Sequence, residues 1–286
     1  MIWCHNCFMK IQETLEHVKI DRLDAEVLLA HVLGKDRSWL ISHSSDELNS
    51  NQKKKFDELI TRRKNHEPVA YITGEKEFYG RKFKVDPRVL IPRPATEALI
   101  DEVKKLYEMK FEIETPRTME ADTDIVIFAE VFSIQHSAFS IQELSIIDVG
   151  TGSGCIGITL ALEIPDIKII CTDISEDALE VAKENADIHK VTDRITFANA
   201  DLFSGSGSGW GSDLNPFLVV SNPPYVPESE TLPPDLSFEP KTALFAGTDG
   251  LEVVERLYKQ CKEHPKCLGC MLEIRLEQAK KITTHH

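Results

Sequence analysis

From residue 144 onward, short apolar runs alternate with longer runs whose apolar residues recur at helical spacing. The short runs, typical of buried β-strands, lie at 144–149, 167–172, 195–198, 217–220 and 268–274. Runs with helical spacing lie at 155–162, 178–189 and 251–261. Strands that alternate with helices predict a parallel sheet joined by right-handed crossovers. We therefore expect an α/β fold over this part of the chain.

The first part of the chain has a different pattern. Residues 10–67 carry apolar positions typical of short amphipathic helices, one capped by Asp24 and ended by Gly34. Two apolar patches around Gly80, within 78–85, predict a β-hairpin, and a helix is expected over 96–107. We divide the chain into a helical bundle (1–72), a hairpin and linker (73–95) and a larger domain (96–286), with an insertion of unassigned structure near 111–142.

Composition and charge narrow the class of protein. The chain has 286 residues, 42% hydrophobic and 28% charged, as an ordinary soluble protein has. It contains no apolar run of about 18 residues, so we expect no membrane span. We also expect no secretory signal, because residues 1–10 lack a continuous apolar stretch, and no transit peptide, because acidic residues come early. The net charge of −14 argues against a protein that mainly grips a phosphate backbone, although a local basic groove is compatible with it.

The seven cysteines are interpreted as free thiols. Cys4 and Cys7, like Cys267 and Cys270, have the spacing of zinc ligands. The second pair adjoins the apolar residues 271–274, where cysteine is more simply a small buried residue. We expect no bound metal.

A glycine-rich turn follows the first strand of the alternating region, at Gly150-Thr151-Gly152-Ser153-Gly154. Glycines at alternate positions allow a tight turn and a close approach of the backbone to a ligand. An ordinary strand–helix turn is the alternative interpretation. The spacing G-x-G-x-G differs from the dinucleotide fingerprint G-x-G-x-x-G, and the sequence has no P-loop. Together with Asp148 two residues before the first glycine and Asp201 after the third strand, this favours S-adenosylmethionine over NAD.

Acidic residues follow the next two strands. Asp173 lies 19 residues after Gly154, where a carboxylate can accept both hydroxyls of a ribose; the alternative is a helix N-cap. Asp201, followed by Leu202, comes after the third strand and is a candidate for contact with an adenine amine. These residues predict a site for an adenosine-containing cofactor.

The most informative motif for the chemistry is Asn222-Pro223-Pro224-Tyr225. We interpret it as part of an active site, and the alternative interpretation is a plain loop between a strand and a helix. The two prolines stiffen the corner where a buried strand ends and donate no hydrogen bonds. The flanking side chains and the carbonyls can then hold a planar amide or amine for attack.

These motifs together resemble the HemK/PrmC family of class I methyltransferases. The resemblance rests also on Tyr71-Ile72-Thr73-Gly74, Phe78-Tyr79-Gly80, Ile91-Pro92-Arg93-Pro94, Glu239-Pro240, Ala243-Leu244 and Asp249-Gly250-Leu251. It implies a Rossmann-like domain, S-adenosyl-L-methionine as cofactor, and methylation of the glutamine of Gly-Gly-Gln in class 1 peptide release factors. The implied cofactor contacts are Gly150 to Gly154, Asp173, Asp201, Leu202 and Asn222.

The resemblance also implies roles for individual residues. Asn222 and the Pro223 carbonyl would accept the N–H bonds of the substrate amide, and Tyr225 would pack over it. Arg93 and Pro94 would shape the rim, with a surface ion pair as the equal alternative for Arg93. The N-terminal bundle would help to grip the release factor.

The chain departs from the family pattern at Ala95, usually Glu, and at Arg275, usually Gly. Class I methyltransferases also close their sheet with a sixth strand and an antiparallel seventh, whereas only 12 residues follow Ile274 here. We expect these two strands to be missing, as in a truncated or variant product, and the apolar edge at 271–274 to be unpaired. A strand from 111–142 at that edge is the alternative.

Two rival functions stay open from the sequence. A nucleic-acid amino-methyltransferase acting on adenine or guanine shares Asn-Pro-Pro-Tyr, but the charge of −14 argues against it. A non-catalytic binding protein is compatible with the missing strands. We expect no membrane association, no direct nucleic-acid binding, and a cytoplasmic location, with the mitochondrion as the alternative in a eukaryotic cell.

Overall fold

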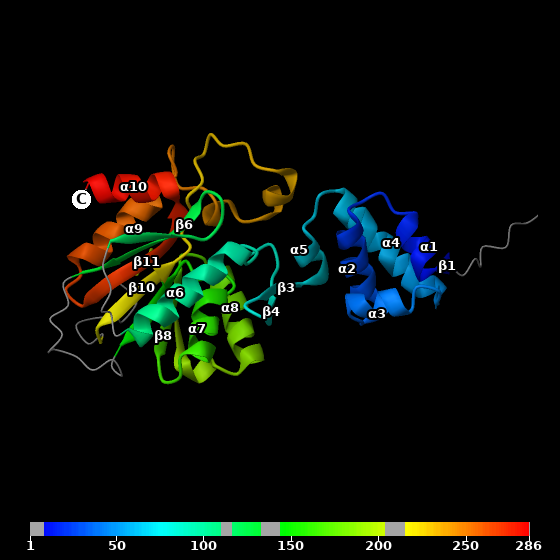
Figure 1. Cartoon of the computed structure of the whole chain (residues 1–286), viewed down its shortest axis with the longest axis horizontal. Helices are drawn as coiled ribbons and strands as arrows, with labels where there is room; N and C mark the ends of the chain where they lie inside the picture. The colour runs from blue at the N-terminus through cyan, green and yellow to red at the C-terminus, as the bar shows by residue number, and fades with distance from the viewer. Residues whose placement is uncertain (1–8, 110–115, 133–143, 204–214, 286) are drawn as a thin grey trace, which may run out of the picture. The chain divides into compact units, whose positions relative to one another are not determined.

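The computed structural model describes residues 9–109, 116–132, 144–203 and 215–285, and these residues form two compact units. The first unit comprises the residues up to Glu75 together with Leu232–Phe238. Its elements are a two-stranded sheet and five helices: β1 (Met9–Lys10), α1 (Ile11–Glu16), α2 (Arg22–Leu33), α3 (Arg37–Ser42), β2 (Glu47–Leu48), α4 (Ser50–Lys64) and α5 (Val69–Thr73) (Figure 1). None of the helices in the described ranges is long and apolar enough to cross a membrane.

Helix α2 shows how local sequence sets the ends of these helices. The Asp21 carboxylate accepts hydrogen bonds from the backbone N–H groups of Leu23 and Asp24, and Gly34 ends the helix with φ at 63°. The prediction of Asp24 as the cap is therefore wrong. Asp24 lies inside the helix and pairs with Arg63 of α4, which also contacts Asp235 of the 232–238 segment at 2.9 Å. The apolar faces of α1 to α4 enclose one buried cluster that includes Leu28 and Phe56.

The second unit contains a β-hairpin and a seven-stranded sheet with helices on both faces (Figure 1). The hairpin strands are β3 (Glu75–Phe78) and β4 (Arg81–Lys84), and Tyr79 and Gly80 form the turn with positive φ. The sheet follows the order β5-β6-β11-β10-β7-β8-β9. Its strands are β5 (Arg117–Glu120), β6 (Ile125–Val131), β7 (Ser145–Val149), β8 (Lys168–Asp173), β9 (Ile195–Asn199), β10 (Phe217–Ser221) and β11 (Cys267–Arg275).

Strands β7 to β11 are mutually parallel, which confirms the α/β prediction from the alternating pattern. Two layers of helices cover the sheet. One face packs against α6 (Glu97–Glu108), α7 (Cys155–Glu163) and α8 (Glu176–His189), and the other against α9 (Glu252–Glu263) and α10 (Leu276–His285) (Figure 1). Cys267 and Cys270 are buried in β11; Cys4 and Cys7 lie outside the described residues.

The edge beyond β11 differs from expectation. Strand β6 pairs antiparallel with β11 along its whole length, from Gly269 opposite Val131 to Arg275 opposite Ile125, and β5 pairs antiparallel with β6. The prediction of an unpaired edge at 271–274 is therefore wrong, and the alternative is confirmed, because part of the 111–142 segment supplies two strands. Strand β6 therefore runs antiparallel to β11, and β5 runs in the same direction as β11.

Strand β6 is also part of the hydrophobic core. Ile127 and Ala129 belong to the cluster under α6 and α7, whereas Val126 and Phe128 belong to the cluster under α9 and α10. A strand buried on both faces reads as a continuous apolar run, as 125–129 does. The segment is thus integral to the sheet rather than a surface insertion.

Candidate active site

The glycine-rich turn lies at the carboxyl end of β7, between β8 and β10. The chain from β7 goes through α7 to β8, so the strand order reverses here, and this is where α/β sheets bind ligands. Gly152 has φ at 54°, and its N–H donates to Asp173 at 2.9 Å. At Gly154, with φ at 80°, a Cβ would lie 2.8 Å from the Ile158 side chain. Conformation and packing therefore both require glycine in this turn.

A fully buried carboxyl, Asp148, lies under the turn. The Thr151 hydroxyl and the Gly157 N–H donate to its Oδ2 at 2.5 and 3.0 Å, whereas Oδ1 has no partner among the described residues. Burial raises the pKa of Asp148 to about 6, against the opposing effect of these two donors. Asp148 thus ties the turn to the first turn of α7 while carrying a poorly solvated charge.

This burial predicts a pH-dependent difference between the protein and its Asp148→Asn variant. The carboxyl is easier to protonate in the folded state, with a pKa of about 6 against an ordinary value of 3.8, so its neutral form favours folding at low pH. That contribution, about 3 kcal/mol, is lost as the pH rises between these two pKa values. The stability of Asp148→Asn relative to wild type should therefore increase between about pH 4 and about pH 7. Urea denaturation across this range measures it, and a constant difference would contradict the assignment.

Asp173 ends β8 and faces the same cavity as the glycine turn. Its Oδ2 accepts the Gly152 N–H and its Oδ1 accepts the Ser175 N–H, each at 2.9 Å. The N-cap of α8 is Ser175, whose hydroxyl oxygen accepts the Ala178 N–H, so Asp173 is not the helix cap. Burial raises the pKa of Asp173 against these backbone hydrogen bonds. Each carboxylate oxygen retains a lone pair for a ligand hydroxyl.

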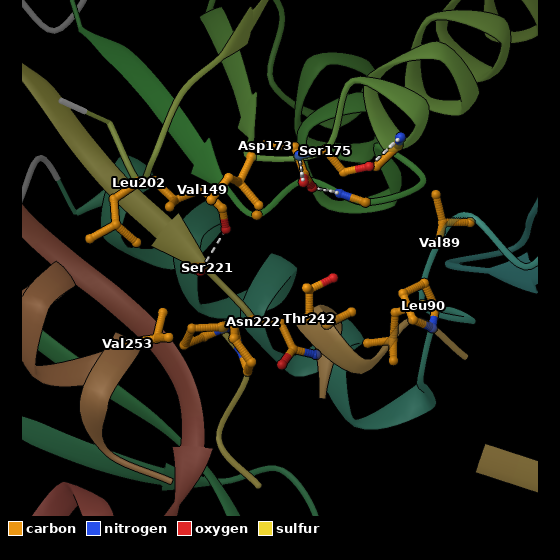
Figure 2. Close-up of a pocket in the computed structure, with 18 of the residues that line it drawn as sticks. Val89, Leu90, Val149, Asp173, Ser175, Leu202, Ser221, Asn222, Thr242 and Val253 are labelled. Atoms are coloured by element: carbon orange, nitrogen blue, oxygen red, sulfur yellow. Dashed lines mark hydrogen bonds between the residues drawn. The ribbon is translucent and has the colours of Figure 1, made fainter. Parts of the chain in front are cut away.

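A cavity of about 290 Å³ brings these groups together. Of the residues predicted from the sequence, eight line it: Gly150, Gly152, Asp173, Asp201, Leu202, Asn222, Pro223 and Pro224. Figure 2 shows Asp173 and Ser175 on one side of the cavity and Asn222 and Val253 on another, with the Ser221 hydroxyl bonded to the Val149 carbonyl at 2.6 Å. That bond joins the ends of β7 and β10 where the cavity opens.

Three predicted residues of the turn, Thr151, Ser153 and Gly154, support the site without lining this cavity. Thr151 and Ser153 are buried, and the Ser153 carbonyl accepts from the Asn185 amide of α8 at 2.8 Å. Gly154 is the N-cap of α7. Asp201 lies on the cavity wall but is half exposed and paired with Arg256 of α9. An adenine amine would compete with this ion pair for the Asp201 carboxylate.

The corner after β10 is held from two sides. The Nδ2 group of Asn222 donates to the Thr96 hydroxyl at 3.1 Å and to Glu273 of β11 at 2.9 Å. Tyr225 packs against the cluster under α9 and α10, with Arg275 over its ring at 6.0 Å. Burial raises the pKa of Tyr225 to about 12, so its hydroxyl stays neutral. Tyr225 is not among the residues that line the cavity.

Arg275 and Arg93 each form an ion pair near the corner. Arg275 forms two hydrogen bonds of 2.7 Å with Glu230, beyond the corner. Arg93 pairs with Glu239, whose side chain is buried and also accepts the Ile91 N–H at 3.1 Å. This second pair joins the segment before α6 to the segment after the corner, so it is neither a surface ion pair nor part of the cavity wall. Nothing in the structure explains Ala95.

Comparisons with known proteins identify the family. A PrmC N-terminal domain matches residues 8–74, and a methyltransferase small domain matches residues 126–234. The release factor glutamine methyltransferase of Koribacter versatilis is 39% identical over 88% of this chain and 78% of its own length. That of Chlorobaculum tepidum is 42% identical over 80% of this chain and 71% of its own. The chain belongs to the release factor glutamine methyltransferase family.

Relatives with a longer chain match as well. The bifunctional methyltransferase of Rickettsia typhi is 39% identical over 93% of this chain and 48% of its own length. The chain therefore spans about half the length of these bifunctional relatives. Membership of the release factor glutamine methyltransferase family makes S-adenosyl-L-methionine the cofactor of the domain.

The residues present fit that cofactor. The glycine turn leaves open space beside Gly150 and Gly152, where a Cβ would meet no atom within 4 Å, and Asp173 offers two acceptor oxygens for ribose hydroxyls. Apolar side chains supply flat contact surface for an adenine ring. They are Val89, Leu90, Val149, Ile174, Leu202, Phe245 and Val253.

Sequence reasoning missed a number of the lining residues. Val89 and Leu90 precede a proline-containing segment, Thr242 and Phe245 follow the corner, and Val253 lies in α9. Their only sequence signal is proximity to motifs that were recognised, Ile91 to Pro94 and Ala243-Leu244. Thr96 and Glu273 carried no signal of their own, because their contacts with Asn222 join residues far apart in the chain.

Proposed function

We propose that this chain transfers a methyl group from S-adenosyl-L-methionine to the side-chain amide nitrogen of glutamine in the Gly-Gly-Gln motif of class 1 peptide release factors. The observation that carries the proposal is Asn222, which lines the cavity beside the glycine turn and Asp173. Its two amide hydrogens are engaged by Thr96 and Glu273, so the oxygen is available to a substrate N–H. The relatives from Koribacter versatilis and Chlorobaculum tepidum are release factor glutamine methyltransferases by name, which supports the proposal.

The chemistry follows from the nature of a carboxamide. Its nitrogen lone pair is delocalised into the carbonyl, so the nitrogen is a weak nucleophile. The cofactor supplies a methyl group already activated on a sulfonium. The Asn222 oxygen and the Pro223 carbonyl would accept the two substrate N–H bonds, which orients the nitrogen and stabilises the positive charge that develops on it. The N–C bond would form as the S–C bond of the sulfonium breaks, the sulfur would leave as a neutral thioether, and one of the two N–H protons would pass to solvent.

The rigidity of the corner serves this placement. Pro223 and Pro224 fix the backbone torsions and line the cavity, and β10 before them is wholly buried. The Ser221 hydroxyl bonded to Val149 anchors the corner to the strand that carries the glycine turn. Acceptors held in this way need no reorganisation when the substrate arrives. Tyr225, held by the core and by Arg275, would limit the space beyond the amide.

The N-terminal unit is proposed to bind the release factor. It matches the PrmC N-terminal domain and encloses its own hydrophobic cluster. Two of its large apolar side chains are exposed, Leu23 by 50% and Ile41 by 76%. Single exposed apolar residues are normal on a protein surface, so the support for this role is the match to the PrmC N-terminal domain.

The proposal is tested by incubating the full chain with S-adenosyl-L-methionine and a class 1 release factor. Mass spectrometry of the Gly-Gly-Gln peptide should show one added methyl group on the glutamine. A factor whose motif glutamine is replaced by alanine is the matched control and should stay unmodified. Parallel reactions with DNA and ribosomal RNA should incorporate no labelled methyl group, and labelling of nucleic acid in place of the factor would contradict the proposal.

A further inference from the structure

Glu273 is a buried carboxyl next to the catalytic corner. Only 1% of the residue is exposed, and its Oε2 has no hydrogen-bond partner in the described structure. It lies in β11 directly after Leu272, which is paired with Ser221 at the end of β10. An apolar residue would suit this position in a two-sided core better, because a buried polar atom without a partner destabilises the fold. A carboxyl at this position therefore calls for another explanation.

Its hydrogen bond with Asn222 offers that explanation. A primary amide nitrogen carries two hydrogens, and here one is donated to Glu273 Oε1 at 2.9 Å and the other to Thr96 Oγ1 at 3.1 Å. Among the described residues, none donates a hydrogen bond to Oδ1 of Asn222. Since Asn222 lines the cavity, the oxygen is the amide atom left for a ligand.

The chemistry of the carboxylate selects this orientation. A carboxylate only accepts hydrogen bonds, so rotation of the Asn222 amide by half a turn would bring two oxygens together. The rotated amide would also present N–H groups to a substrate that itself offers N–H groups. The Asn222 amide has two orientations of nearly the same shape, and Glu273 strongly favours one of them. In the favoured orientation, the Asn222 oxygen can accept the substrate N–H.

We propose that Glu273, together with Thr96, is a positioning residue that fixes the Asn222 amide with its oxygen toward the substrate. The proposal deepens the function proposed above and rests on it for the identity of the substrate. Burial raises the pKa of Glu273 to about 7, against the effects of Thr96, Arg93 and Asn222. Near neutral pH a large share of Glu273 is therefore ionised, and the ionised form holds the amide hydrogen most strongly.

The first test compares two substitutions at position 273. Glu273→Met removes the acceptor at similar volume, whereas Glu273→Gln keeps an oxygen that can accept the Asn222 hydrogen. We expect kcat for release-factor methylation to fall about 100-fold in Glu273→Met, as for other misplaced catalytic groups. The affinity for the cofactor should stay within about threefold of wild type in both variants. The substitution affects a contact made in the transition state, whereas the contacts that bind the cofactor remain. Glu273→Gln should retain kcat within about tenfold of wild type, as the partial loss of a charge-assisted bond implies.

A matched control lies on the neighbouring strand. Glu130 of β6 is opposite Cys270 of β11 and accepts from the Tyr258 hydroxyl, away from the cavity. Glu130→Met makes the same chemical change as Glu273→Met in the same part of the sheet and should leave kcat unchanged. An equal loss of kcat in Glu130→Met and Glu273→Met would indicate a general effect on the fold and would overturn the positioning role.

The second test exchanges donor and acceptor. Asn222→Asp alone places two carboxylates together and should be nearly inactive. In Asn222→Asp combined with Glu273→Gln, the glutamine amide donates to one aspartate oxygen and the other oxygen remains for the substrate. The double variant should therefore be at least about tenfold more active than Asn222→Asp, a coupling of roughly the size expected for residues in contact. A double variant no more active than the single one would overturn the proposal.

A third measurement does not depend on the substrate. In the full wild-type chain labelled with ¹⁵N-asparagine, the side-chain NH₂ hydrogens of Asn222 should exchange slowly with solvent. In Glu273→Met, where the hydrogen bond from Asn222 to residue 273 is lost, they should exchange at least about tenfold faster. Asn185 is an internal control, because its buried NH₂ donates to the Lys84 and Ser153 carbonyls and makes no contact with Glu273. Exchange of Asn222 that is equally fast in both proteins overturns the positioning role. If Asn222 exchanges slowly in wild type and faster in Glu273→Met, but no release factor is methylated, the proposed function is overturned and the positioning role is not.

Discussion

Replacing Asn222 by alanine is expected to abolish methyl transfer while the cofactor still binds. The substitution removes the oxygen that accepts the substrate N–H and the amide that Thr96 and Glu273 hold in place. Loss of one preorganised polar group in an active site costs about 10²–10³ in kcat. Because Asn222 also determines where the amide nitrogen lies, we expect the upper end of this range. Initial rates with labelled S-adenosyl-L-methionine and a release factor measure the loss.

Cofactor affinity separates this effect from damage to the cavity. The glycine turn and Asp173 bond to each other and to α8, not to the Asn222 side chain. Calorimetric titration of Asn222→Ala should therefore give an affinity within about threefold of wild type, as expected when binding contacts remain and a transition-state contact is lost. A variant that remains fully active would refute the amide-holding mechanism, and one that no longer binds the cofactor would reassign Asn222 to cofactor binding.

Truncating Ile127 to alanine is expected to destabilise the second unit by about 2–5 kcal/mol, the usual cost of an apolar deletion in a packed core. Ile127 is fully buried in β6, opposite Glu273 of β11 and opposite Met119 of β5. The deletion leaves a cavity between the sheet and α6. Denaturation by urea, followed by circular dichroism, measures the loss.

The matched control is Ile188→Ala in α8, because that isoleucine is 57% exposed. The same deletion there should change stability by less than about 0.5 kcal/mol, as most surface substitutions do. The comparison tests whether β6 is an integral part of the sheet or an appended strand. Equal small effects at both positions would show that β6 is dispensable, and the edge of β11 would then have to be protected in another way.

The parallel strands could be predicted from the sequence because β7, β10 and β11 are buried on both faces and give continuous apolar runs. Positions 217–220 are a continuous apolar run, and the strand extends only one residue further, to Ser221. The positive φ values of Gly150, Gly152 and Gly154 bear out the backbone freedom inferred for the turn. Such signals are local, since hydrophobic run length and backbone freedom are properties of neighbouring residues.

Pairing between distant segments could not be predicted in this way. The run at 125–128 indicates a strand, but nothing within it specifies β11 as its neighbour or an antiparallel direction. The N-cap of α2 shows the same limit at short range. Asp21 and Asp24 are both suitable caps, and the contact of Asp24 with Arg63 exists only in the folded unit. Such contacts cannot be predicted from local sequence, because they stabilise the protein only when folding brings the distant segments together.

The sequence by itself determined the chemical groups of this protein: a glycine turn, a carboxylate one strand away, and a stiff Asn-Pro-Pro-Tyr corner. Tertiary structure alone decided what surrounds them. It brought Thr96 and Glu273 to the two hydrogens of the Asn222 amide. It also placed β6 and β5 beside β11, a pairing that the sequence offered only as an alternative. The physical reason is that a side chain's identity sets what it can donate or accept, whereas its orientation depends on partners that only folding brings within hydrogen-bond distance.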